Sequence, residues 1–216
     1  MTEQEILIKT EKYVKKELAD AEGGHDWWHI QRVRSNARLI AESEVCDKLV
    51  VELSALLHDI ADSKFNDGNE NIGPEKAEKF LKSISLDSGK TDHIVKIVRN
   101  ISFKGGNFKV NFKSKELDIV QDADRLDAMG AIGIARAFNY GGHKGRLLYH
   151  PEIKPVLNLD KEAYKKSSAP TINHFYEKLL RLKDRMNTKT GKQLAEERHQ
   201  FMENFLKQFY KEWGEE

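Results

Sequence analysis

Residues 50–62 read VVELSALLHDIAD, and this stretch decides the fold class. Its apolar residues lie on nearly every side of a helix, which is typical of a helix at the centre of a hydrophobic core. Asp47 stands just before the stretch, at the position of a helix N-cap. The stretch therefore predicts a buried central helix that ends in two ionisable residues, His58 and Asp59.

The sequence on either side predicts further helices. The chain has only four prolines in 216 residues, and residues with high helix propensity are abundant. Thr2 with Glu5 forms a capping box, Asp26 is placed to cap a second helix, and Pro74 suits an early helical position. We expect the first helix to be closed by Gly23 and Gly24, because glycine is frequent at helix C-termini.

The second half of the chain is also expected to be helical. A stripe of Leu117, Val120, Ala131, Ile134 and Phe138 predicts one long helix that ends at the pair Gly141-Gly142. Two more amphipathic helices are predicted, through residues 175–182 and 194–213. Residues 104–114 are interpreted as a loop, with a short hairpin as the alternative.

The length suits one domain, because single cores keep growing up to roughly 250 residues. We therefore predict an all-α, single-domain helical bundle over residues 1–216. Its core motifs span residues 25–140, a loop-rich insertion spans about 141–170, and C-terminal helices span about 171–214. The long insertion is expected to be functional and to border the site, since long structureless loops are uncommon in compact domains.

Composition excludes several classes of partner. A net charge of +1 gives no overall field that would favour nucleic acid, and no apolar window is long enough for a membrane span. The N-terminus lacks the pattern of a signal peptide, and the single cysteine, Cys46, cannot form an intramolecular disulfide. These features favour a cytoplasmic protein with a small-molecule substrate, and no nucleic-acid or membrane partner is expected.

Three fragments carry ionisable groups beside apolar helical stripes: HDWWHIQRV (25–33), LLHDIAD (56–62) and QDADRLDAMG (121–130). Asp124 falls at helical spacing with Val120, on the stripe expected to face the core. A buried carboxylate is costly unless it is paired or bound to a metal. Two imidazoles and two carboxylates offset a divalent charge and leave room for a water and a substrate oxygen. We therefore expect His29, His58, Asp59 and Asp124 to bind one divalent cation.

This ordered set resembles the HD superfamily of metal-dependent phosphohydrolases, and the fuller wording is similar to its small bacterial YedJ/YpgQ-like branch. The resemblance implies an HD-type helical bundle and one divalent metal ion (Mn, Mg, Co, Ni, Fe or Zn). It implies His29, His58, Asp59 and Asp124 as the ligands. Dinuclear members have further histidines, whereas His93 is the only histidine between Asp59 and Asp124, so we do not expect a second full metal site.

Other residues near the motifs are candidates for supporting roles. Asp62 could orient a water or transfer a proton, and Lys64 could contact phosphate, so both are predicted to be catalytic. Asp127 is expected to support a metal ligand from behind. Candidates for substrate binding are His25, Asp26, Arg125, His143, Lys144 and Arg146. For each of them the alternative is an ordinary structural or solvated residue. Trp27 and Trp28 could stack a base or simply pack at a helix start.

The sequence thus favours a metal-dependent phosphohydrolase that acts on nucleotides by metal-activated water. The preferred substrates are nucleoside or deoxynucleoside triphosphates, because several basic residues surround the motifs. One alternative is a phosphomonoesterase on nucleoside monophosphates. Another is a non-catalytic HD module that senses a nucleotide or a metal, and a purely structural helical domain is the third.

Overall fold

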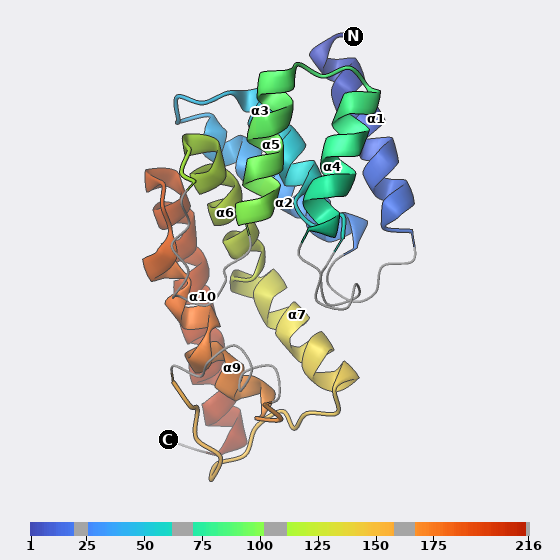
Figure 1. The fold of residues 1–216 in the computed structure, drawn as a ribbon. Helices are drawn as coiled ribbons and strands as arrows, with labels where there is room; N and C mark the ends of the chain where they lie inside the picture. The colour runs from blue at the N-terminus through green and yellow to red at the C-terminus, as the bar shows by residue number, and fades with distance from the viewer. Residues whose placement is uncertain (20–25, 62–70, 102–111, 158–166, 215–216) are drawn as a thin grey trace. The chain divides into compact units, whose positions relative to one another are not determined.

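The computed structural model describes residues 1–19, 26–61, 71–101, 112–157 and 167–214. Within these ranges every regular element is a helix, and no strand is found, so the predicted all-α class is confirmed (Figure 1). No helix in the described part of the chain is long and apolar enough to cross a membrane. Contacts divide the chain into two compact units, Met1–Asp124 and Arg125–Glu216. That residues 1–216 form one HD domain stays a prediction.

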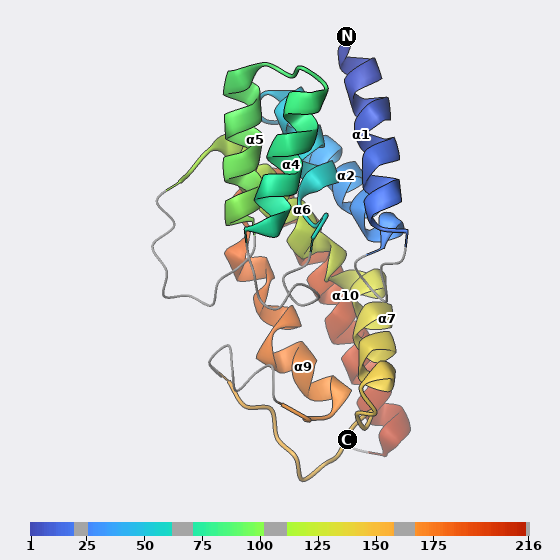
Figure 2. The same cartoon turned by 45° about the vertical axis from the view of Figure 1, so that its right-hand side comes forward.

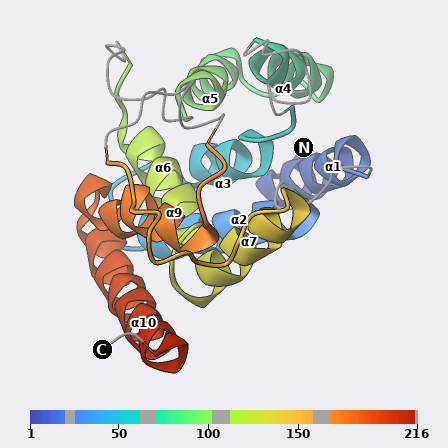
Figure 3. The same ribbon diagram turned by 90° about the horizontal axis from the view of Figure 1, so that it is seen from below.

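The first unit is built around the helix predicted to be central. Its helices are α1 (Glu3–Glu17), α2 (Trp27–Ala41), α3 (Lys48–Leu57), α4 (Ile72–Ser83) and α5 (Ser88–Asn100), followed by most of α6 (Lys115–Asp127). Helix α3 packs against α1, α2 and α5, and α4 packs on α5 (Figure 3). The α3 side chains Val51, Leu53 and Leu56 are fully buried. Helix α3 is therefore the core element to which the others attach.

The predicted helix starts of this unit are confirmed. Thr2 and Glu5 form a reciprocal capping box, and the carboxylates of Asp26 and Asp47 accept hydrogen bonds from backbone N–H groups of α2 and α3. Helix α1, however, ends at Glu17, several residues before Gly23 and Gly24, which lie outside the described residues.

The second unit contains α7 (Gly130–His143), α9 (Thr171–Glu177), two short 3-10 turns η2 (Leu179–Arg181) and η3 (Lys183–Arg185), and α10 (Lys189–Trp213). Helix α7 packs against both α9 and α10 (Figure 2). Phe138 of α7, Phe175 of α9 and Phe205 of α10 form an aromatic cluster with ring centroids 5.9–6.1 Å apart. This cluster joins the three helices of the unit through aromatic contacts.

The prediction of one long helix from Leu117 to Phe138 is wrong. Helix α6 ends at Asp127 and α7 begins at Gly130, which adopts a left-handed φ of 66°. Met129 before it has an extended conformation, so the α-helical hydrogen-bond ladder is interrupted. Because of the break, Ala131 is exposed and does not continue the apolar stripe.

Two further boundaries differ from the prediction. Helix α7 runs through Gly141 and Gly142 and is followed by Gly145, which has a φ of 63°. The helix predicted over residues 175–182 ends at Glu177 and continues as the turns η2 and η3. Residues 102–111, which include most of the predicted loop at 104–114, lie outside the described residues.

Candidate metal centre

His29 enters the site from the first turn of α2. The carboxylate of Asp26 accepts a hydrogen bond from the backbone N–H of His29 at 2.9 Å, and thereby fixes the start of the helix. The side chain of His29 is only 2% exposed. The helix N-terminus thus holds a buried imidazole whose Nε2 faces the other candidate ligands.

His58 and Asp59 follow the last residue of α3, and His58 itself is the C-cap. The Nδ1 of His58 lies 2.8 Å from the carbonyl oxygen of Ala55. Since a carbonyl oxygen can only accept, Nδ1 carries the proton and Nε2 presents a lone pair. A hydrogen bond of this kind from the non-ligating nitrogen is the usual way in which a metal-binding histidine is oriented.

Asp124 comes from α6, which is hydrogen-bonded to two neighbouring helices just before this residue. The Asn36 side chain of α2 donates to the carbonyl oxygen of Ala123 at 3.3 Å, and Gln121 donates to that of Asn100 at 3.0 Å. The Asp124 side chain is 40% exposed, so the prediction that it lies on a core-facing stripe is wrong. Asp122 is the fully buried carboxylate of this stretch. Asp124 instead lies at the solvent-accessible edge of the cluster.

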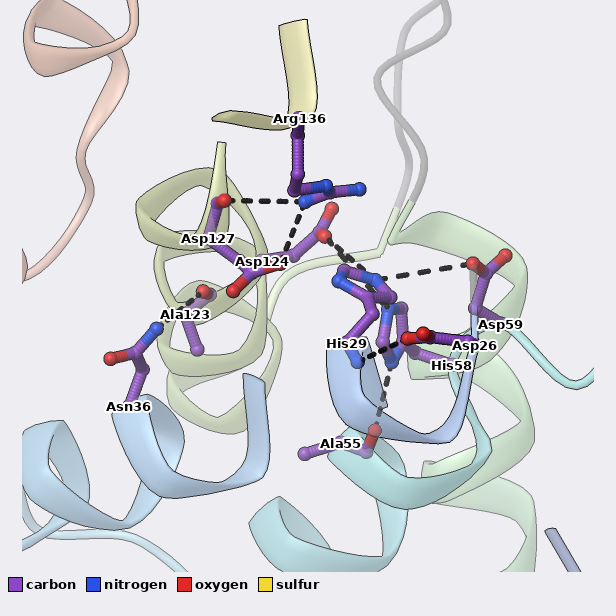
Figure 4. Close-up of polar contacts among 10 residues, drawn as sticks. All are labelled: Asp26, His29, Asn36, Ala55, His58, Asp59, Ala123, Asp124, Asp127 and Arg136. Carbon is purple, nitrogen blue, oxygen red and sulfur yellow. Dashed lines mark hydrogen bonds and ion pairs between the residues drawn. The ribbon is translucent and has the colours of Figure 1, made fainter. Parts of the chain in front are cut away.

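The four side chains converge on one small volume (Figure 4). The Nε2 atoms of His29 and His58 are 3.2 Å apart. The Asp124 Oδ1 is 3.6 Å from the His29 Nε2 and 3.8 Å from the His58 Nε2. The Asp59 Oδ2 is 4.0 Å from the His29 Nε2, and the ligand atoms of His29, His58 and Asp59 all lie within 4.8 Å of one another.

These separations fit a shared cation. Two atoms that each lie about 2.0–2.2 Å from one metal are about 3–4.4 Å apart, depending on the coordination angle. The distances from His29 to the other three side chains fall within this range. Two neutral imidazoles and two carboxylates also supply the charge that balances a divalent ion.

The short distance between the two imidazoles is itself informative. The hydrogen bond from Nδ1 to the Ala55 carbonyl selects the tautomer in which the His58 Nε2 has a lone pair. The His29 Nε2 at 3.2 Å must therefore donate a hydrogen bond to it or share a cation with it. With Asp59 and Asp124 beside the pair, the second arrangement satisfies all four side chains at once.

The other predicted residues fall into three groups. His25, Asp62 and Lys64 lie outside the described residues, so their roles stay predictions. Arg125, Asp127, His143, Lys144 and Arg146 belong to the second unit. The substrate-binding role predicted for Asp26 also remains untested, although its carboxylate caps α2.

Within the second unit, several of these residues have structural contacts. Arg125 donates to the Arg185 carbonyl oxygen at 2.7 Å, and buried Asp127 pairs with Arg136 at 2.6 Å (Figure 4). His143 and Lys144 are exposed at the end of α7. Arg146 donates to the carbonyl oxygen of Ser167 at 2.6 Å, and its guanidinium lies 5.5 Å from the Tyr140 ring centroid.

Two residues that position the site were missed by the sequence analysis. Asn36 lies seven residues after His29, which is two helical turns along the same face, and this spacing was the available signal. Arg34 is 8% exposed and pairs with Glu11 of α1 and Glu52 of α3. An arginine among the apolar residues of α2 was the signal for this network.

Comparisons with known proteins agree with this geometry. Residues 27–129 match the HD domain family model, and this range contains all four candidate ligands. The chain is 41% identical to the uncharacterized protein YpgQ of Bacillus subtilis, over 93% of this chain and 90% of that one.

Solved structures show the same fold. An HD-superfamily hydrolase from Bacillus thuringiensis is 43% identical over the whole of both chains, with a TM-score of 0.80. The crystal structure of Bacillus subtilis YpgQ in complex with ADP is 37% identical, with a TM-score of 0.77, and covers 98% of this chain and 97% of that one. On the strength of the motif match, the sequence identity and the shared fold, the chain belongs to the HD superfamily of hydrolases.

Proposed function

We propose that this enzyme is a metal-dependent phosphohydrolase of nucleotides, with nucleoside or deoxynucleoside triphosphates as its preferred substrates. The observation that carries the proposal is the pair of imidazole nitrogens 3.2 Å apart, flanked by the carboxylates of Asp59 and Asp124. One divalent ion (Mn, Mg, Co, Ni, Fe or Zn) would be held by these four residues. When bound, such an ion polarises a phosphoryl oxygen and makes water a better nucleophile at neutral pH.

The chain's own residues have distinct parts in this proposal. His58 is kept in one tautomer by the Ala55 carbonyl, and His29 is fixed by the first turn of α2. Both rings are buried, whereas Asp124 lies at the accessible edge where a substrate can approach. Asp62 would hold or transfer the proton, and Lys64 would bind a phosphate oxygen. Asp127 would support the ligand set from the same helix as Asp124.

Nucleotide substrates are supported by a relative. Bacillus subtilis YpgQ was crystallised in complex with ADP, and it shares the fold over nearly the whole chain. Phosphate chains are bound by basic side chains, and Arg125, His143, Lys144 and Arg146 are proposed for this role. His25 and Asp26 are proposed to face the substrate. A reducing cytoplasmic setting, which the single free cysteine Cys46 favours, is part of the same proposal.

A product analysis tests the function. The purified protein is incubated with nucleoside mono-, di- and triphosphates in the presence of Mn²⁺, Co²⁺, Ni²⁺ or Mg²⁺, and the products are separated by anion-exchange chromatography. We expect triphosphates to yield a monophosphate and pyrophosphate. Release of single phosphates from monophosphates would favour the phosphomonoesterase alternative, and no turnover with any metal would leave a sensing module.

A further inference from the structure

The two tryptophans before His29 have different surroundings. Trp27 is partly buried, and the Lys15 ammonium lies 4.5 Å from the centroid of its ring. Trp28 is 65% exposed. The fold therefore uses the first indole for packing and leaves most of the second accessible, one residue before a candidate metal ligand.

Helix geometry places this indole beside the site. Successive residues of a helix diverge by about 100°, so Trp28 and His29 occupy adjacent sectors of the first turn of α2. Arg32 lies one turn further on, four residues from Trp28 and three from His29, and falls between these two sectors. The first turn of α2 thus presents the indole of Trp28 and the imidazole of His29 on neighbouring faces of the helix.

A nucleotide carries matching groups: an aromatic base at one end, which can stack on an indole, and charged phosphates at the other, which can reach a metal centre. We propose, on the basis of the function proposed above, that Trp28 is the surface on which the base of the substrate stacks while its phosphates reach the His29 side. An indole can stack on any of the bases, because every base has a π face. The enzyme then accepts several bases and favours purines over pyrimidines.

Kinetics with and without a base test this role. Trp28→Ala is compared with Trp28→Phe on a nucleoside triphosphate and on inorganic tripolyphosphate, which has the phosphates but no base. Loss of stacking is worth roughly 1–3 kcal/mol per base, so we expect the KM for the nucleotide to rise about 5- to 150-fold with Trp28→Ala. The KM for tripolyphosphate should stay unchanged, and Trp28→Phe should recover most of the affinity.

A matched control is available on the same helix. Leu39 is 46% exposed and follows Trp28 by eleven residues, about three turns along the same face of α2. Leu39→Ala should leave both KM values unchanged. Equal losses for the nucleotide and for tripolyphosphate, or equal effects of Leu39→Ala and Trp28→Ala, would overturn the stacking role.

A binding measurement gives a readout independent of turnover. ADP is titrated into the protein while tryptophan fluorescence is recorded, with Mg²⁺ as the metal. The wild type should show quenching that Trp28→Phe loses, although Trp27 and Trp213 remain. If the wild type hydrolyses nucleotides and Trp28→Ala binds ADP normally, the stacking role fails and the proposed function stands. If ADP quenches the fluorescence of the wild type but no nucleotide is hydrolysed, the proposed function fails and the stacking role stands.

Discussion

At the scale of single residues, Asp59 gives the cleanest test of the ligand set. Its carboxylate lies 4.0 Å from the His29 Nε2. A substitution here removes a candidate ligand and no large apolar side chain. We expect Asp59→Ala to abolish turnover and metal retention while the helical content stays that of the wild type. Metal content by mass spectrometry, steady-state rates and circular dichroism check the three parts of this expectation.

Asp92 supplies the control for this substitution. It is an exposed acid on α5, and its carboxylate pairs with Lys96, four residues later on the same helix, at 2.7 Å. Asp92→Ala removes the same charge and should leave metal content and activity unchanged. Activity of Asp59→Ala at saturating metal equal to that of Asp92→Ala would remove Asp59 from the ligand set.

His174 gives a prediction for the pH dependence of stability. Burial lowers the pKa of His174 to about 3 from 6.5, and the positive charges of Lys178 and Arg146 act in the same direction. Below pH 6.5 the unfolded chain binds a proton at this residue that the folded protein does not bind. The free energy of unfolding should therefore fall as the pH falls from about 6.5 toward 3.

The contribution of His174 is isolated by a difference measurement. Urea unfolding of the wild type and of His174→Gln is compared at several pH values, without metal for both proteins. The stability of the wild type relative to the variant should decrease between pH 7 and pH 4. A difference that does not change with pH would show that His174 titrates normally in the folded protein.

At the scale of helices, the arginine network of the first unit holds the elements that carry the ligands. Arg34 of α2 pairs with Glu11 of α1 at 2.6 Å and with Glu52 of α3 at 2.8 Å. Helix α2 carries His29, and α3 ends at His58. Because the network joins these helices directly, it helps to maintain the distance between the two imidazoles.

Removing Arg34 should therefore be costly. The loss of one partner from a fully buried ion pair typically costs about 3–5 kcal/mol. The Glu11 and Glu52 side chains are 27% and 15% exposed, so the cost here lies at the lower end of that range. We expect Arg34→Ala to lower the free energy of unfolding by about 3 kcal/mol. Lys82→Ala breaks an exposed pair with Glu78 and should cost less than about 0.5 kcal/mol. Equal effects of the two substitutions in chemical denaturation would contradict a structural role for the network.

The helices also show which features can be predicted from sequence. Helix starts were found because a cap such as Asp26 or Asp47 acts within three residues. The break between α6 and α7 was missed because distant residues support it. Arg198 of α10 donates to the Leu126 carbonyl at 2.5 Å, and Arg136 donates to that of Asp127 at 3.2 Å. These contacts satisfy carbonyls that a continuous helix would have paired internally.

The site was predictable to a similar extent. The order of the motifs indicated four candidate ligands, and the structure places their side chains close together. That they bind a metal stays a prediction. The exposure of Asp124 was not predictable, since the periodicity assumed an unbroken helix through Ala131. Local signals marked Asn36 and Arg34 on the inward side of α2, but the partners of these side chains depend on which helices become neighbours.

At the scale of the whole molecule, metal binding should stabilise the folded state. The candidate ligands come from α2, α6 and the end of α3, so only the folded chain brings all four together. A ligand that binds only the folded state, at a free concentration about 100 times its Kd, raises the free energy of unfolding by roughly 2.7 kcal/mol. We expect Mn²⁺ to raise the Tm of the wild type and of Asp92→Ala but not that of Asp59→Ala. A rise of equal size in all three proteins would locate the stabilising metal elsewhere.

We propose that one divalent ion is held by His29, His58, Asp59 and Asp124. An anomalous difference map from crystals grown with Mn²⁺ locates this ion. We expect a single strong peak at about 2.0–2.2 Å from the Nε2 atoms of both histidines and from a carboxylate oxygen of each aspartate. A peak bound by other residues, or a map in which the His29 Nε2 points away from the metal, would contradict it.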